Sequence, residues 1–297
     1  MTVTMREQMV LTIEDIFERD ERAALLLAAI SRVQFEPVLQ RYPLRAYNLG
    51  IMEQSLVSVA AGMALEGFIP FVHSITPFLV ERPYEQIKDD FCYQQLEGNF
   101  ISTGASYDYG TDGMTHHGLA DVPLLKNLPG MQIVVPGTAG ELDRLLREAY
   151  GNGSPTYYRT AASTNPHEFA VRFGKLEVVK RGSRAAVVAV GSSLAYVQPA
   201  VDDLDVNLLY CTTVAPFDSE TLRNVYQGSN IIVVEPYYEG TLVPDICAAL
   251  RDRPIRVEAI GVPRRVLSQY GTPEQHDAAV GLTPHDIRQR IDRFLQA

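Results

Sequence analysis

The sequence has no tryptophan, only three cysteines and no long apolar run. Cys92, Cys211 and Cys247 are scattered and odd in number, so they match neither a metal-binding spacing nor a disulfide framework. This cysteine usage is typical of a reduced, cytoplasmic compartment. The apolar run at residues 23–30 is far too short to cross a bilayer, and residues 1–7 lack the basic-then-apolar pattern of a signal peptide. We therefore expect no membrane contact and no secretion.

Positive charge is also scarce. The chain has 26 lysines and arginines against 36 acidic residues, a formal net charge of −10, and no basic cluster offsets the deficit. Nucleic-acid surfaces need a patch of positive charge, so this balance argues against a nucleic-acid partner. The 297 residues are 46% hydrophobic and 21% charged, which is typical of a globular protein with room for two domains.

The first half of the chain alternates apolar segments with helical patterns. The continuous apolar run at residues 23–30 is typical of a strand buried on both faces. Further strands are expected at residues 42–47, 67–73, 99–103, 131–136 and 155–159. Helices are expected at residues 5–19, 78–96, 140–149 and from Glu53 onward, and Pro83 marks a candidate break in the second of these. Strands that alternate with helices predict an α/β fold with a mostly parallel sheet.

The second half repeats this alternation after an interruption. Residues 166–182 have no clear period and are interpreted as a linker between a first domain at 1–165 and a second at 183–297. In the second domain, strands are expected at residues 184–190, 206–210 and 230–235. The last helix has clear start signals, with Thr283 as its N-cap and Pro284 at its first position. The sequence therefore predicts two α/β domains, each with helices flanking its sheet.

Glu53 is a single carboxylate at the start of a helix that is rich in small side chains. The helix carries Ser55, Ser58, Ala60, Ala61, Gly62 and Ala64. Small side chains let two backbones come close, so we expect this helix to pack tightly, either within the chain or against another subunit. The structural alternative is a buried helix whose macrodipole favours an acid in its first turn.

A long glycine-rich loop follows the strand expected at residues 99–103. Residues 107–118 hold Asp112, His116 and His117 among three glycines. Ligands bind at the carboxyl ends of strands in open α/β sheets, and long loops with Asp and His between strands are often functional. The alternative is a solvated surface loop. No third metal ligand is signalled, and no Gly-x-Ser-x-Gly elbow supports a serine hydrolase.

Several motifs, taken in order, resemble the transketolase family. In the first half they are Gly50-Ile-x-Glu-Gln, Pro70-Phe-Val followed by Phe78-Leu and Arg82-Pro-Tyr-Glu-Gln-Ile, Asp112-Gly-x-Thr-His-His-Gly, and Leu128-Pro-Gly-Met-Gln-Ile-Val-Val-Pro. In the second half they are Val190-Gly-Ser, Val214-Ala-Pro-Phe-Asp, Val233-Val-Glu, Gly271-Thr-Pro-Glu and Gly281-Leu-Thr. The first half resembles the pyrimidine-binding domain, also found in 1-deoxyxylulose-5-phosphate synthase, and the second half resembles the family's C-terminal domain.

The resemblance implies a subunit of a split transketolase. Full-length members have a further domain in front, whose Gly-Asp-Gly…Asn motif binds the diphosphate of thiamine diphosphate through Mg²⁺, and this motif is absent here. The implied partner is therefore a separate diphosphate-binding subunit that holds the Mg²⁺ ligands. Family active sites lie between domains of different subunits, which implies an α₂β₂ heterotetramer. The implied reaction moves a two-carbon ketol unit from a ketose or ketose phosphate to an aldehyde acceptor.

The resemblance also implies roles for individual residues. Glu53 matches the glutamate that forms a hydrogen bond with N1′ of the aminopyrimidine, and Phe78 matches an aromatic residue that stacks on that ring. A carboxyl group beside the ring nitrogen in a dry site favours the imino tautomer, which removes the proton from the thiazolium carbon. Asp112 and His116 match the pair that faces the substrate hydroxyls and the reaction intermediate. Arg159 matches an arginine that binds the distal phosphate of sugar phosphates, a task suited to guanidinium.

The sequence also departs from the family pattern. Ile75 stands where a second aromatic residue of the cofactor pocket is expected, and residues 28–31 lack a carboxylate that relatives often have. Residues 104–105 contain neither the histidine nor the arginine that helps relatives to bind substrate. Tyr107 and Tyr109 are expected to line that pocket instead. We therefore expect a non-standard substrate.

Two other functions remain open at this stage. The β subunit of a 2-oxoacid dehydrogenase E1 shares the domain order and length of this chain, but the Asp112 loop resembles transketolase more closely. A non-catalytic scaffolding or regulatory subunit is favoured by the missing carboxylate and aromatic residue. The presence of Glu53, Phe78, Asp112 and His116 opposes that alternative.

Overall fold

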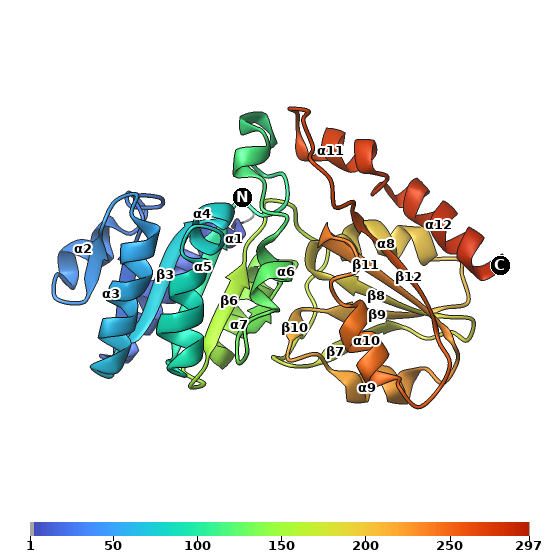
Figure 1. The fold of residues 1–297 in the computed structure, drawn as a ribbon, viewed down its shortest axis with the longest axis horizontal. Helices are drawn as coiled ribbons and strands as arrows, with labels where there is room; N and C mark the ends of the chain where they lie inside the picture. Colours follow the sequence, from blue (N-terminus) through green and yellow to red (C-terminus); the bar gives the residue numbers. More distant parts are fainter. Residues whose placement is uncertain (1–2, 297) are drawn as a thin grey trace.

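The computed structural model describes residues 3–296 and contains two β-sheets, one centred in each half of the chain. Figure 1 shows the two halves side by side, with the first coloured blue to green and the second yellow to red. Helices cover both faces of each sheet. The predicted α/β fold with two mostly parallel sheets is confirmed.

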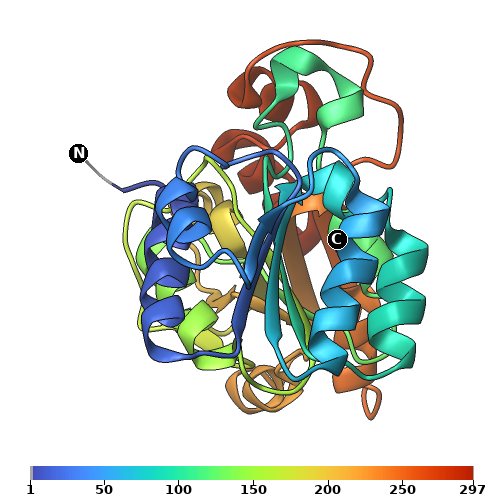
Figure 2. The same ribbon diagram turned by 90° about the vertical axis from the view of Figure 1, so that its left-hand side faces the viewer.

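The first sheet has the strand order β10-β5-β6-β4-β3-β1-β2, and all its neighbours are parallel except β10 and β5. Its strands are β1 (Ala23–Leu27), β2 (Ala46–Asn48), β3 (Ile69–Ile75), β4 (Gly98–Thr103), β5 (Gln132–Val134), β6 (Pro155–Arg159) and β10 (Thr213–Ala215). Helices α1 (Met5–Arg19) and α7 (Ala139–Ala149) pack together on one face, and α3 (Glu53–Leu65) packs on the other (Figure 2). All of β1 is buried because both faces are covered, as its continuous apolar sequence predicted.

The second sheet has the order β12-β11-β8-β9-β7. Strands β8 (Ala186–Val190), β9 (Asn207–Cys211), β11 (Asn230–Tyr238) and β12 (Arg256–Val262) are parallel, and β7 (Leu176–Lys180) is antiparallel at the edge. Helices α8 (Leu194–Val201) and α12 (Pro284–Gln296) cover one face, and α9 (Ser219–Val225) and α10 (Val243–Ala249) cover the other. The predicted cap of α12 is present, since the Asp286 amide donates to Thr283 Oγ1 at 3.2 Å.

The two halves are joined more closely than the sequence suggested. Strand β10 comes from the second half but pairs with β5 of the first sheet. Strand β7 lies inside residues 166–182, which were interpreted as a linker, and pairs with β9 of the second sheet. Helix α11 (Pro273–Val280) lies beside the loop that follows β4 (Figure 1). The second half therefore helps to hold that loop.

The helix expected at residues 78–96 is interrupted near Pro83, as the sequence indicated, and its second part is mostly π-helical rather than α-helical. The structure has α4 (Thr76–Val80), α5 (Tyr84–Gln86) and a π-helical segment, η1 (Ile87–Tyr93). Pro83 separates the first two because proline lacks an amide donor and disfavours helical backbone before it. The strand expected at 42–47 is also shifted, to β2. Within residues 3–296, no helix combines the length and apolar character that a membrane span requires.

Candidate active site

Glu53 lies at the start of α3, beside the carboxyl end of β3, and only 2% of its surface is exposed. Its Oε1 accepts a hydrogen bond from Ser74 Oγ at 3.1 Å, and its Oε2 accepts one from Arg82 Nη1 at 3.0 Å. A carboxylate has about four acceptor positions, so room for another donor remains. This edge of a parallel sheet is where ligands of α/β proteins bind.

Phe78 lies between a guanidinium and an imidazole. The guanidinium carbon of Arg82 is 3.9 Å from the centre of the Phe78 ring. The ring of His116, on the short helix η3 (Met114–His116), meets Phe78 edge-on with 5.1 Å between ring centres. Arg82 therefore links the buried carboxylate of Glu53 to the half-buried Phe78 ring, and Phe78 in turn contacts His116.

Ile75 and Tyr109 lie against the same glycine, Gly104. A Cβ built on Gly104 would collide with the Tyr109 ring and would lie 3.5 Å from Ile75 Cγ2. Tyr109 also contacts His116, with 6.4 Å between ring centres. The tyrosine ring thus occupies the space over residue 104, where relatives were expected to carry a histidine or arginine.

Asp112 ends η2 (Gly110–Asp112) and is exposed, without a hydrogen bond or ion pair from its side chain within residues 3–296. Gly113 separates it from η3 and adopts φ 78° and ψ −171°. A Cβ on Gly113 would lie 2.6 Å from the Tyr270 ring, which comes from the second half of the chain. Asp112 and His116 therefore sit on consecutive turns of a loop that the second half contacts.

Tyr107 and His117 face the second half. Tyr107 stacks on His276 of α11, with ring centres 4.8 Å apart and 14° between the planes. His117 meets the same imidazole edge-on at 5.0 Å. Burial, together with the neighbouring His276 and His116, lowers the pKa of His117. The structure thus places Tyr107 in the contact between the two halves, whereas Tyr109 is the tyrosine beside His116.

Arg159 is enclosed, with 1% of its surface exposed. Its Nε donates to Asp121 Oδ2 at 2.7 Å, and its Nη2 donates to the carbonyl of Gly118 at 2.7 Å and to Ser106 Oγ at 3.1 Å. A phosphate would have to compete with the buried Asp121 carboxylate for this guanidinium. Among the described residues, the hydrogen bonds of Arg159 go to Asp121 and to the loop after β4, and none of them joins it to Glu53 or His116.

Sequence reasoning gave no role to Ser74 or Arg82. Arg82 had a usable signal, since it follows Phe78 by four residues, which is the spacing of neighbours on a helix face. Ser74 had a weaker signal. It follows the buried His73 near the end of β3, and successive side chains of a strand point to opposite faces of the sheet. Hydrogen bonds from both residues to Glu53 depend on the tertiary fold, so the sequence alone did not reveal them.

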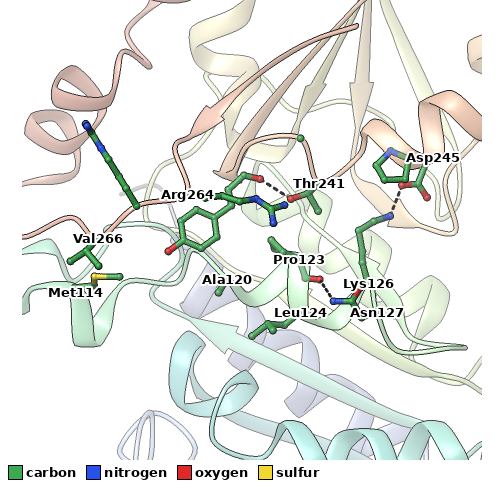
Figure 3. Close-up of a pocket in the computed structure, with 14 residues that line it drawn as sticks. Met114, Ala120, Pro123, Leu124, Lys126, Asn127, Thr241, Asp245, Arg264 and Val266 are labelled. Atoms are coloured by element: carbon green, nitrogen blue, oxygen red, sulfur yellow. Dashed lines mark hydrogen bonds and ion pairs between the residues drawn. The ribbon is translucent and has the colours of Figure 1, made fainter.

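A cavity of about 810 Å³ lies elsewhere, between the two halves (Figure 3). Met114 is at its border, but Glu53, Phe78, Asp112 and His116 do not line it. The candidate active site is thus defined by side-chain geometry at the edge of the first sheet rather than by this cavity. Among residues 3–296, no three His, Cys, Asp or Glu side chains are grouped so that they would hold a metal ion.

Two family profiles match the chain. Residues 1–165 match the transketolase pyrimidine-binding domain, and residues 174–287 match the transketolase C-terminal domain. Together they cover both sheets of the structure. The family resemblance inferred from the motifs is therefore confirmed.

Curated relatives agree with these profiles. An uncharacterized 33.6 kDa protein in the fasciation locus of Rhodococcoides fascians is 36% identical, over 96% of this chain and 92% of that protein. One of the subunits of an apulose-4-phosphate transketolase of Actinobacillus succinogenes is 28% identical, over 78% of this chain and 79% of its own length. A 1-deoxy-D-xylulose-5-phosphate synthase of Geobacter metallireducens is 31% identical over 96% of this chain, which spans about half of that enzyme's length.

Solved structures give the same result. A split-gene transketolase in the form of an inactive β4 tetramer superposes with a TM-score of 0.88 at 27% identity, over 99% of each chain. A transketolase from Campylobacter jejuni has a TM-score of 0.81 at 15% identity, over 98% of this chain and 47% of that one, which shows the shared fold alone. The chain therefore belongs to the transketolase family and contains its pyrimidine-binding and C-terminal domains.

Proposed function

We propose that this chain is the pyrimidine-binding subunit of a two-chain, thiamine-diphosphate-dependent, transketolase-like enzyme. The observation that carries the proposal is the buried carboxylate of Glu53 at the edge of the first sheet, which Arg82 links to Phe78 and, through Phe78, to His116. The enzyme would transfer a two-carbon ketol unit from a ketose or ketose phosphate to an aldehyde acceptor. Its similarity to one chain of a multi-subunit transketolase, over most of both chains, supports this assignment.

The side chains at this edge fit an aminopyrimidine ring. Glu53 is buried and keeps acceptor positions for a ring nitrogen, while Phe78 offers an aromatic surface. Arg82 lies over one face of Phe78, where its guanidinium also holds Glu53. When bound, thiamine diphosphate supplies a carbon nucleophile that lets the bond next to the donor carbonyl break.

The chain's own residues would orient the reactants and hold protons. Glu53, fixed by Ser74 and Arg82, would hold a proton at the ring nitrogen. His116 has Nδ1 3.0 Å from Thr115 Oγ1, which leaves Nε2 for a substrate hydroxyl. Asp112, on the preceding turn, would accept from a second hydroxyl. Ile75 would flank the ring in place of an aromatic residue.

A second chain would complete the site. The diphosphate and the Mg²⁺ would be bound by a separate diphosphate-binding subunit, in an α₂β₂ heterotetramer. The split-gene transketolase of almost equal length supports this division of the enzyme. Because Tyr109 fills the space over Gly104, the acceptor pocket differs from that of relatives. We therefore expect poor turnover of xylulose 5-phosphate with ribose 5-phosphate, and normal kinetics with this pair would refute the altered specificity.

Calorimetry tests the proposal directly. Mg²⁺ and thiamine diphosphate are titrated into this chain alone, then into its mixture with a candidate diphosphate-binding chain. Binding is expected in the mixture. The affinity is expected to fall at least tenfold in Glu53→Gln, because a hydrogen bond to a charged group is worth about 1.5–3 kcal/mol. Glu21→Gln is the matched control, since Glu21 is exposed and distant in sequence from the site.

The alternatives predict different results. A stable two-chain complex that binds no cofactor would favour a scaffolding subunit. Cofactor binding that is equal in the wild type and Glu53→Gln would remove Glu53 from the site. Decarboxylation of a 2-oxoacid with transfer to a lipoyl carrier would assign the chain to the E1 class instead.

A further inference from the structure

The cavity between the two halves has the size of a small-molecule site. Its volume is about 810 Å³, within the usual range of about 300–1,000 Å³ for ligand pockets. Helix α6 (Asp121–Leu125) and the turn after it form one wall, and residues 238–245 and 264–266 form the other. Much of the lining is apolar: Met114, Pro123, Leu124, Pro244 and Val266.

The charged groups of this cavity do not balance. Lys126 Nζ and Asp245 Oδ2 form an ion pair of 2.6 Å across the two halves and neutralise each other. Arg264 and Arg265 are exposed, and within residues 3–296 their side chains form no ion pair or hydrogen bond. Figure 3 shows Arg264 extending over the cavity between Thr241 and Pro123. Two uncompensated cations thus lie in one cavity of a chain whose formal net charge is −10.

This combination matches one class of ligand. A guanidinium binds phosphate oxygens through two parallel hydrogen bonds, and a phosphate monoester carries a charge of about −1.5 to −2 at neutral pH. A guanidinium without an anionic partner therefore suits a phosphate, and the apolar wall suits a carbon skeleton. We propose that this cavity binds a small organic phosphate, with Arg264 on the phosphate, Arg265 adding positive charge to the lining, and the apolar residues on the organic part.

Binding is tested on this chain alone, so the result does not depend on the proposed function. Phenyl phosphate is titrated by calorimetry at low ionic strength, with benzyl alcohol as the uncharged comparison. Phenyl phosphate is expected to bind, to bind less tightly at high salt, and to lose at least tenfold in affinity in the Arg264→Gln/Arg265→Gln double variant. Arg251→Gln is the matched control, because Arg251 is also exposed and unpaired among the described residues but does not line the cavity.

A second measurement avoids dependence on variants. Phenylglyoxal modifies exposed arginines, and phenyl phosphate is expected to protect Arg264 and Arg265 but not Arg251 when the products are mapped by mass spectrometry. The proposal is overturned if wild-type protein does not bind phenyl phosphate, or if the double variant binds it as tightly as the wild type. Equal modification of all three arginines with and without the probe would overturn it as well.

The phosphate has two conceivable sources, and the assembled enzyme distinguishes them. If it is the distal phosphate of a substrate, a source favoured by the enclosure of Arg159, the double variant raises KM for a ketose phosphate and leaves KM for the free ketose unchanged. If it belongs to a separate effector, both KM values stay the same and the effect of phenyl phosphate on turnover disappears. This assignment rests on the proposed function, whereas the binding measurements do not.

Discussion

The guanidinium of Arg82 joins the two groups on which the candidate site depends. It donates to Glu53 Oε2 at 3.0 Å and its central carbon lies 3.9 Å from the Phe78 ring centre. Glu53 is buried, whereas Arg82 is 40% exposed. An exposed cation that holds a buried acid in place contributes little to folding but fixes the geometry of the site.

Replacing Arg82 by Gln should therefore affect cofactor binding more than stability. We expect the affinity of the assembled enzyme for thiamine diphosphate to fall roughly tenfold, because Glu53 loses a charge-assisted hydrogen bond. The midpoint of urea unfolding should change little. Calorimetry and urea titration measure the two effects separately, with Arg41→Gln as a control at another exposed ion pair. Unchanged affinity in Arg82→Gln would show that Ser74 alone suffices to position Glu53.

Replacing Arg159, in contrast, should affect stability more than ligand binding. It forms an enclosed ion pair with Asp121, whose Oδ2 also accepts from the Tyr157 hydroxyl at 2.7 Å. Removing one partner of a buried pair costs about 3–5 kcal/mol, since the remaining charge is left unpaired. Arg159→Met should lower the free energy of unfolding by that amount, and adding Asp121→Leu should restore part of it. If Arg159→Met folds normally and only raises KM for phosphorylated substrates, the predicted phosphate-binding role of Arg159 would be supported instead.

The sequence predicted the fold where local pattern and burial agree. β1 could be predicted because a strand covered on both faces is continuously apolar. The cap at Thr283 could be predicted because its hydrogen bond spans only four residues of the chain. β10 has only three residues and depends on its pairing with β5, a tertiary contact. β7 is mostly half-buried, so its sequence carries no clear alternation.

The same distinction applies to the candidate site. Glu53, Phe78 and His116 could be predicted as site residues because they belong to motifs that resemble those of the transketolase family. The environment of Arg159 could not be predicted, because Gly118 and Ser106 come from a loop that is distant from Arg159 in the sequence. The role of Arg264 was not visible either, since its exposed position matters only in relation to α6 across the cavity.

Glu235 should make stability depend on pH. It is fully buried in β11, accepts hydrogen bonds from the amides of Thr241 and Leu242 at 3.0 Å each, and burial raises its pKa from 4.5 to about 7. Between these values the folded state holds a proton that the unfolded state has released. The contribution of Glu235 to stability is therefore fully present below about pH 4.5 and is lost as pH rises through about 7.

Urea unfolding at a series of pH values checks this expectation. Glu235→Gln should reduce the loss of stability between pH 5 and 8 by about 1–3 kcal/mol, since each unit of pKa shift corresponds to about 1.4 kcal/mol. Burial also raises the pKa of Asp108 and Asp277 to about 6, so a weaker slope of the same sign should remain in the variant. Identical slopes in both proteins would mean that Glu235 keeps an ordinary pKa in the fold.

Gly113 should be required for the loop that carries Asp112 and His116. Its φ of 78° with ψ of −171° is open essentially to glycine alone, and a Cβ there would lie 2.6 Å from the Tyr270 ring. Gly113→Ala should therefore destabilise the chain by about 1–3 kcal/mol in urea unfolding and displace the loop, which would lower kcat of the assembled enzyme more than tenfold. Adding Tyr270→Ala removes the collision but leaves the backbone strain, so the double variant should recover only part of the stability. Full recovery would show that the contact with the second half, rather than backbone conformation, makes glycine necessary, and full activity of Gly113→Ala would separate this loop from catalysis.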